Sequence, residues 1–85
     1  MLGIILDKQP QKFFDRCDDE LFNKITNKLE SLKENPFPQE TKRLQDYALP
    51  TFRIRIGKYR VLYRVDNNEI VIVVIKIDKR DKVYD

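Results

Sequence analysis

The sequence contains no histidine, no tryptophan, one cysteine and only two glycines among its 85 residues. Without histidine, Ser–His triads and imidazole acid–base catalysis are excluded. One cysteine without histidine also speaks against a structural zinc site. Because Cys17 cannot form an internal disulfide, the composition indicates a reducing compartment, and we expect a cytoplasmic protein.

Long hydrophobic runs are missing as well. The longest, from Ile70 to Ile75, is far shorter than the ~18 residues that span a bilayer. The N-terminal stretch has neither a basic region nor a cleavage site, so we do not expect a signal peptide or a membrane partner. A chain of this length supports one small domain, which we predict over residues 1–85.

Positive charge is concentrated in the second part of the chain. Residues 51–85 hold nine of the 17 Lys and Arg residues but only five of the 14 Asp and Glu residues. Between Thr51 and Arg64 there are five cations and no anion. Such an imbalance is typical of a surface that binds phosphates or an acidic partner.

The order of elements predicts an α+β fold of the type β-α-α-β-β-β. An apolar first strand precedes two helices at helical apolar spacing, and residues 36–51, with three prolines, form an ordered connector. We predict a mainly antiparallel sheet with an N-terminal helical hairpin packed on one face, and the place of the first strand stays open. We expect a strand over 2–6, a helix over about 10–18, and strands over 52–56, 59–66 and 69–77. Between them, a second helix is capped by Asp18 or Asp19 and stopped by Asn35-Pro36.

The turn at Gly57-Lys58 sets the register of the first predicted hairpin. Glycine at the first central position fits a type II′ turn, which pairs Arg55 with Arg60. Like charges directly across two strands are destabilising, so their clustering favours a bound anion. Alternation then places on one side of the sheet a set that we call the arginine face: Arg53, Arg55, Arg60, Leu62 and Arg64.

The second hairpin is predicted to turn at Asn67-Asn68, because asparagine tolerates the positive φ of a type I′ turn. This register pairs Arg64 with Val71, Leu62 with Val73 and Arg60 with Ile75. It places Val71, Val73 and Ile75 beside the arginines, where apolar neighbours strengthen charge contacts, and Ile70, Ile72 and Val74 in the core.

These residues resemble a known family. The stretch 52–65, which reads FRIRIGKYRVLYRV, and the stretch 79–84, which reads KRDKVY, are similar to the RelE/ParE superfamily of toxins from type II toxin–antitoxin systems. The length and element order agree over nearly the whole chain. The terminal Arg-x-x-Val-Tyr pattern resembles the RelE branch, whose members cut messenger RNA in the ribosomal A site and are silenced by an antitoxin.

The resemblance implies a function, partners and site residues. It implies a metal-independent mRNA endoribonuclease with no cofactor, in which a ribose 2′-OH attacks the adjacent phosphate. Its implied partners are mRNA, the ribosome and a RelB-like antitoxin. It assigns Arg60 and Arg80 to the scissile phosphate, Arg53 and Arg55 to basic strand positions, Tyr84 to stacking or activation, and RNA contacts to Lys58, Arg64, Lys79 and Lys82.

Several alternatives stay open. Arginine cannot deprotonate usefully, so neither Arg53 nor Arg55 can be the general base that a lysine could become. The base is then Tyr84, Lys79 or Lys82, a ribosomal group or water. At the level of function, the alternatives are a ParE-like toxin that inhibits DNA gyrase and an inactive relative that only binds antitoxin or RNA.

Overall fold

The computed structural model describes residues 2–79 of the chain. The α+β class and the helical hairpin are as predicted, and the sheet has five strands in the order β1-β5-β4-β3-β2. β1 runs parallel to β5, and the other neighbours are antiparallel. The elements are β1 (Gly3–Leu6), α1 (Lys8–Arg16), α2 (Asp19–Glu34), β2 (Lys42–Leu44), β3 (Thr51–Ile56), β4 (Tyr59–Asp66) and β5 (Val71–Lys79).

Both helices begin at an aspartate cap. The Asp7 carboxylate accepts from the backbone N–H of Lys8, and the Asp18 carboxylate accepts from that of Leu21 at 2.8 Å. Each bond satisfies an N–H group that the first helical turn leaves unpaired. The second helix ends at Glu34, as predicted from the proline at position 36.

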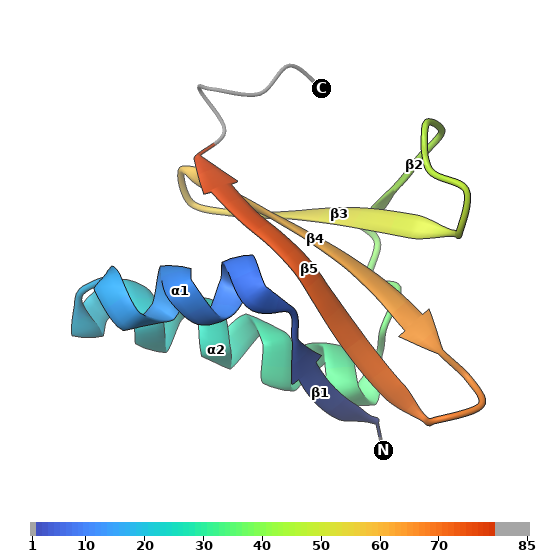
Figure 1. The fold of residues 1–85 in the computed structure, drawn as a ribbon, viewed down its shortest axis with the longest axis horizontal. Helices are drawn as coiled ribbons and strands as arrows, with labels where there is room; N and C mark the ends of the chain where they lie inside the picture. Colours follow the sequence, from blue (N-terminus) through green and yellow to red (C-terminus); the bar gives the residue numbers. More distant parts are fainter. Residues whose placement is uncertain (1, 80–85) are drawn as a thin grey trace.

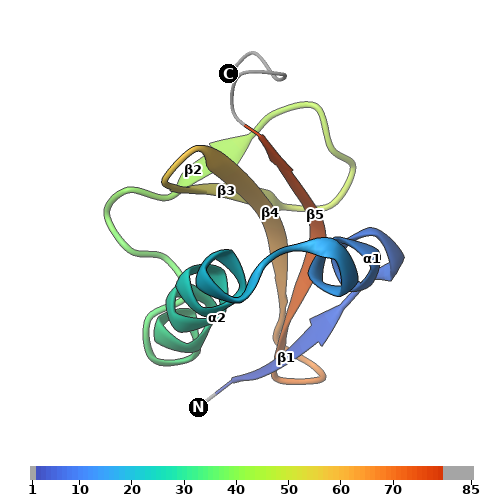
Figure 2. The same cartoon turned by 90° about the vertical axis from the view of Figure 1, so that its left-hand side faces the viewer.

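The two helices lie on the same side of the sheet (Figures 1 and 2). Phe22 departs from the predicted stripe of α2, because it is 42% exposed. Within the described residues, neither helix is long and apolar enough to cross a membrane. The buried core combines one stripe of α2 with the helix side of β3, β4 and β5: Ile25, Leu29, Leu32, Ile54, Ile56, Val61, Tyr63, Ile72, Val74 and Ile77.

The connector between α2 and β3 is tied to the sheet by Tyr63. Its hydroxyl donates to the carbonyl of Pro36 at 2.5 Å and lies 3.2 Å from the Thr41 hydroxyl. Burial raises the pKa of Tyr63, so the hydroxyl remains a donor at neutral pH. This tether leads the chain to β2, a three-residue edge strand that the proline-rich sequence did not predict.

The first hairpin has the predicted register. Arg55 pairs with Arg60, and Arg53 pairs with Leu62. Gly57 has a φ of +59°, and Lys58 is not among the residues with positive φ, as a type II′ turn requires. A Cβ at Gly57 would lie 2.7 Å from the Lys24 ammonium and push this flexible side chain aside, so the positive φ is the stronger reason for glycine here.

The second hairpin differs from the prediction, because its loop spans four residues, 67–70, rather than two. The Asp66 carboxylate accepts from the backbone N–H of Asn68 at 3.0 Å and of Glu69 at 3.1 Å. This Asx-type turn replaces the expected I′ turn. The predicted register was therefore wrong: Arg64 pairs with Val73, and Ile70 is 58% exposed rather than in the core.

A β-bulge shifts the register again at Ile75. Tyr63 pairs with Val74 but Leu62 pairs with Lys76, so Ile75 is the extra residue. Strict alternation from Val74 would have placed Lys76 in the core, at a large desolvation cost. The bulge avoids this cost and brings Ile77 into the core instead, at 1% exposure. The longer loop and the bulge together move the partner of Arg60 from the predicted Ile75 to Asp78, so that predicted pairing was wrong.

Ile70 is expected to limit stability. Its φ of +56° is a left-handed conformation that β-branched residues rarely adopt, at a cost of roughly 1–2 kcal/mol. We predict that Ile70→Asn raises the free energy of unfolding by about 1 kcal/mol, because asparagine tolerates this φ. Urea denaturation measures the change. Ile70→Val keeps the branched Cβ and should leave stability unchanged. If Ile70→Asn instead lowers the free energy of unfolding, the backbone conformation at residue 70 is not a source of strain.

Candidate functional site

The arginine face is the side of the sheet that faces away from the helices. In an antiparallel pair, residues directly opposite each other project from the same face. The observed pairs Arg55–Arg60 and Arg53–Leu62 therefore place three guanidinium groups on one surface of the first hairpin. Two of the three lie directly across from each other. The register that the sequence predicted is confirmed here.

The three arginines differ in exposure. Arg55 is exposed, whereas Arg53 and Arg60 are only 6% and 7% exposed. Leu62 between them is 1% exposed, so the middle of this face is shielded from water. In such surroundings, charge interactions are stronger than in bulk water.

Arg64 lies on the same face farther along β4, about 13 Å from Arg60 at ~3.3 Å per residue. Its Nε donates to the Thr51 hydroxyl at 3.1 Å, and that hydroxyl donates to the carbonyl of Leu49 at 2.9 Å. Thr51 is fully buried, so this contact fixes the direction of the guanidinium. Arg64 lines a cavity of about 540 Å³, together with Leu49, Pro50, Val65, Asp66, Asn67, Asn68 and Val73.

β5 contributes two charged residues to this face that the sequence prediction missed. Lys76 pairs with Leu62 and Asp78 pairs with Arg60, and a 3.2 Å ion pair joins the Lys76 ammonium to the Asp78 carboxylate. An apolar wall of Val71, Val73 and Ile75 was expected here. The first two do lie beside Arg64 and Asp66, but the bulge replaces the third with charged groups. The sequence contains an indication of this arrangement. Strict alternation would place residues 76 and 78 on the same face as the core residues 72 and 74, and their charge makes that placement unfavourable.

The remaining predicted residues are spread more widely. Lys58 is exposed at the tip of the first hairpin. Lys79 pairs with Tyr59, whose side chain is on the helix side, so Lys79 is not part of the arginine face. Arg80, Lys82 and Tyr84 lie outside the described residues. At the other sheet edge, Lys42 pairs with Arg53 and adds a cation that was not predicted.

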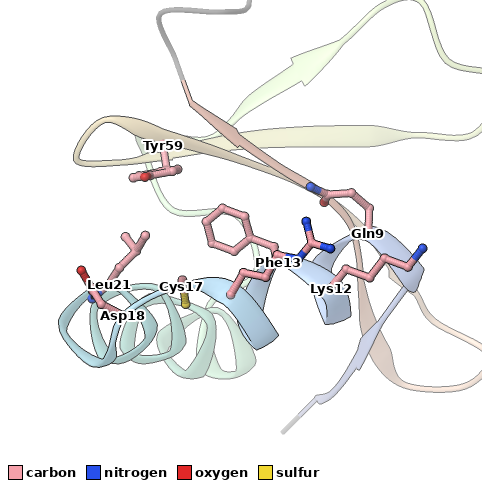
Figure 3. Close-up of a pocket in the computed structure, with 8 residues that line it drawn as sticks. Gln9, Lys12, Phe13, Cys17, Asp18, Leu21 and Tyr59 are labelled. Carbon is pink, nitrogen blue, oxygen red and sulfur yellow. The ribbon is translucent and has the colours of Figure 1, made fainter.

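A second cavity, of about 470 Å³, lies on the helix side of the first hairpin (Figure 3). The Phe13 and Tyr59 rings meet edge to face at 5.5 Å. Burial, followed by the Asp18 charge, raises the pKa of the Cys17 thiol, so Cys17 is not an activated nucleophile. The cavity shares no residue with the arginine face; its lining is Gln9, Lys12, Phe13, Arg16, Cys17, Asp18, Leu21 and Tyr59.

The arginine face has the chemistry of an anion site with two acidic neighbours, Asp78 and Asp66, on the same side of the sheet. Planar guanidiniums bind phosphate oxygens through paired hydrogen bonds, and several of them stabilise the extra charge of a phosphorane-like transition state. Asp78 adds a carboxylate directly across from Arg60. This combination suits phosphoryl chemistry on a nucleic acid strand better than binding of a neutral ligand.

Comparison with known proteins identifies the fold and the family of this chain. A Methanocaldococcus jannaschii protein with the name toxin RelE1 is 39% identical over 64 residues, which cover 72% of this chain and 70% of that protein. The RelE–RelB complex of Pyrococcus horikoshii contains a chain with a TM-score of 0.80 and 23% identity, over 96% of this chain and 98% of that one.

The intact RelBE complex of E. coli gives a TM-score of 0.80 at 21% identity, over 93% of this chain and 96% of the matched chain. These two likenesses establish the shared fold. Residues 4–84 match the family described as the ParE toxin of the type II toxin–antitoxin system parDE. The chain is therefore a member of this toxin family, within the RelE/ParE superfamily.

Proposed function

We propose that this toxin acts as a ribosome-dependent mRNA endoribonuclease in the cytoplasm. The observation that carries the proposal is the cross-strand pair Arg55–Arg60, flanked by Arg53, on the sheet face away from the helices. An arrangement selected for folding alone would separate these charges, whereas a bound RNA phosphate compensates them. The Methanocaldococcus jannaschii relative, whose name includes RelE1, supports the same branch.

In the proposed reaction, the 2′-OH of a ribose attacks the neighbouring phosphorus, giving a 2′,3′-cyclic phosphate and a 5′-OH. The nucleophile belongs to the substrate, so the toxin contributes positioning and charge stabilisation and needs no metal. Arg55 and Arg60 bind the scissile phosphate, and Arg64 binds backbone farther along the strand. The resemblance adds Arg80 at the scissile phosphate and Tyr84, which stacks on or helps activate the nucleotide. It also adds Lys58, Lys79 and Lys82 as RNA contacts.

We also propose a RelB-like antitoxin as the protein partner. The relatives of known structure include RelE–RelB complexes. On this chain an apolar groove of about 230 Å³ runs between β1 and the two helices, and Phe22 is 42% exposed there beside Phe14, with ring centroids 5.2 Å apart. An amphipathic antitoxin segment can bury these rings. The lining is Ile4, Leu6, Phe14, Phe22, Thr26, Leu29 and Glu30.

This partner surface predicts a separable variant. Phe22→Ala removes an exposed aromatic anchor, so we expect the dissociation constant for the antitoxin to rise about tenfold, a loss of ~1.4 kcal/mol. Isothermal titration with a cognate RelB-like antitoxin measures the dissociation constant. Tyr47→Ala, at another aromatic that is 41% exposed, serves as the matched control. Equal affinity for Phe22→Ala and the parent would place the antitoxin elsewhere.

Induced expression with primer extension on a reporter transcript tests the function. We expect growth arrest and cuts within the reading frame that disappear when translation is blocked. Inhibition of supercoiling by purified gyrase, with an intact transcript, would identify a gyrase inhibitor instead. Antitoxin binding without either effect would identify an inactive relative.

A further inference from the structure

Asp78 is an acidic residue directly beside the cations of the arginine face. The bulge at Ile75 turns its side chain to the arginine face, where Asp78 pairs directly with Arg60. The 3.2 Å contact with Lys76, two residues earlier on the same strand, confirms that both side chains project from that face. Asp78 is partly exposed, with 27% of its side-chain surface accessible, so the carboxylate is open to a ligand.

We propose that Asp78 is the general base that deprotonates the attacking 2′-OH. The inference rests on the proposed ribonuclease function and identifies the proton acceptor of the same site. Directly opposite residues in an antiparallel pair have Cβ atoms about 4.5–5.5 Å apart. A phosphate bound by the Arg60 guanidinium therefore brings its adjacent ribose within reach of the Asp78 carboxylate.

The other charged groups around Asp78 suit this role. Arginines do not accept protons at neutral pH, and Lys79 projects from the opposite side of the sheet. Asp78 is the one acidic residue of β5 within the described part of the chain. Lys76 orients the carboxylate, in the way that a third group orients the base in other catalytic sites, and Arg60 and Lys76 together offset its repulsion from the phosphate.

The step is balanced in atoms and charge. The 2′-oxygen forms a bond to phosphorus as its proton passes to the Asp78 carboxylate, and the bond from phosphorus to the 5′-oxygen breaks. The leaving 5′-oxygen takes a proton from solvent water. Asp78 then returns its proton to solvent, so the transesterification needs no oxidant, reductant or other co-reactant.

Single-turnover cleavage of ribosome-bound mRNA tests the proposal. We expect Asp78→Asn to cut about 10²-fold more slowly than the parent, the lower end of what a general base contributes. Glu69→Gln, at an exposed carboxylate in the β4–β5 loop, is the matched control and should cut at the parent rate. Binding to programmed ribosomes and the urea midpoint should be unchanged in Asp78→Asn, which separates a chemical defect from a folding defect.

An mRNA with a sulfur in place of the 5′-oxygen at the cleavage site distinguishes a base from an acid. The thiolate leaves without protonation, so a general acid becomes dispensable while a base does not. We expect the defect of Asp78→Asn to persist on this substrate. If the sulfur substitution restores the rate, Asp78 is not the base.

Two further outcomes would overturn the assignment. A faster rate in Asp78→Asn would mean that the carboxylate holds the cations inactive. A larger loss in Lys76→Met than in Asp78→Asn, with a double variant no slower than Lys76→Met, would reduce Asp78 to a partner of Lys76. Parent-like cutting by Asp78→Asn refutes this inference alone, whereas a parent chain that never cuts on the ribosome refutes the proposed function.

Discussion

Replacing Arg60 with alanine is expected to lower mRNA cleavage by about 10³-fold, the upper end for loss of one preorganised donor at a transition state. Arg60 lies at the centre of the arginine face, opposite Arg55 on one side and Asp78 on the other. It is therefore placed to hold the scissile phosphate between two cations and the proposed base. Arg60→Lys keeps the charge but loses the planar fork, so we expect an intermediate defect.

Arg43 provides a matched control for this variant. It lies exposed on β2 and pairs with Phe52, whose ring is on the helix side, so it does not belong to the arginine face. Arg43→Ala should arrest growth as the parent does, whereas Arg60→Ala should not. Reporter cleavage and antitoxin affinity are measured in parallel, because retained affinity shows that Arg60→Ala is folded. A folded Arg60→Ala with parent-like cleavage would remove the arginine face from the mechanism.

The features that followed from local chemistry were predictable from the sequence. The cap of α2, its end before Pro36 and the turn at Gly57 each depend on a few neighbouring residues. The helix end and the turn are found as predicted, and of the two expected caps the structure has Asp18. The turn alone sets the pairing of Arg55 with Arg60. The arginine face therefore follows from the order of the residues in the hairpin, because a two-residue turn leaves a single register.

The features that depended on distant contacts were missed. β2 exists because Tyr63 and its partners hold the connector beside β3, which nothing within the sequence of residues 42–44 indicates. The four-residue loop depends on Asp66 capping its own turn. The shielding of Arg53 and Arg60 is likewise a property of the assembled chain.

The bulge at Ile75 is the unpredicted feature with the largest effect on the site, because it determines which β5 residues lie on the arginine face. The predicted alternation ends at residue 75. Extended to residue 78, it would place Lys76 and Asp78 in the core with Val74, which buried charge forbids. A one-residue shift in the alternation of apolar and polar residues along a strand is thus a sequence signal for a bulge.

This explanation of the bulge predicts opposite outcomes for two single-residue deletions in β5. Deleting Ile75 makes the pairs Val74–Tyr63 and Lys76–Leu62 consecutive, which is a regular ladder with every side chain on its present face. The deletion lowers stability in only three ways. It removes the half-buried Ile75 side chain, changes the local twist of the strand, and strains the two hydrogen bonds between the Gln9 amide and the Ile77 backbone. We expect the free energy of unfolding to fall by about 1–3 kcal/mol and the protein to remain folded.

Deleting Ile77 leaves no acceptable register. In one register, Asp78 moves into the position of Ile77 opposite Val61. In the other, the strand slides and Lys76 takes that position. Each register places a charged side chain among residues that are 0–1% exposed. A buried unpaired charge costs several kcal/mol, comparable with the whole stability of a small domain, so this variant should be unfolded. Urea denaturation followed by circular dichroism compares the two. Equal destabilisation by both deletions would show that the bulge, rather than side-chain parity, is what β5 requires.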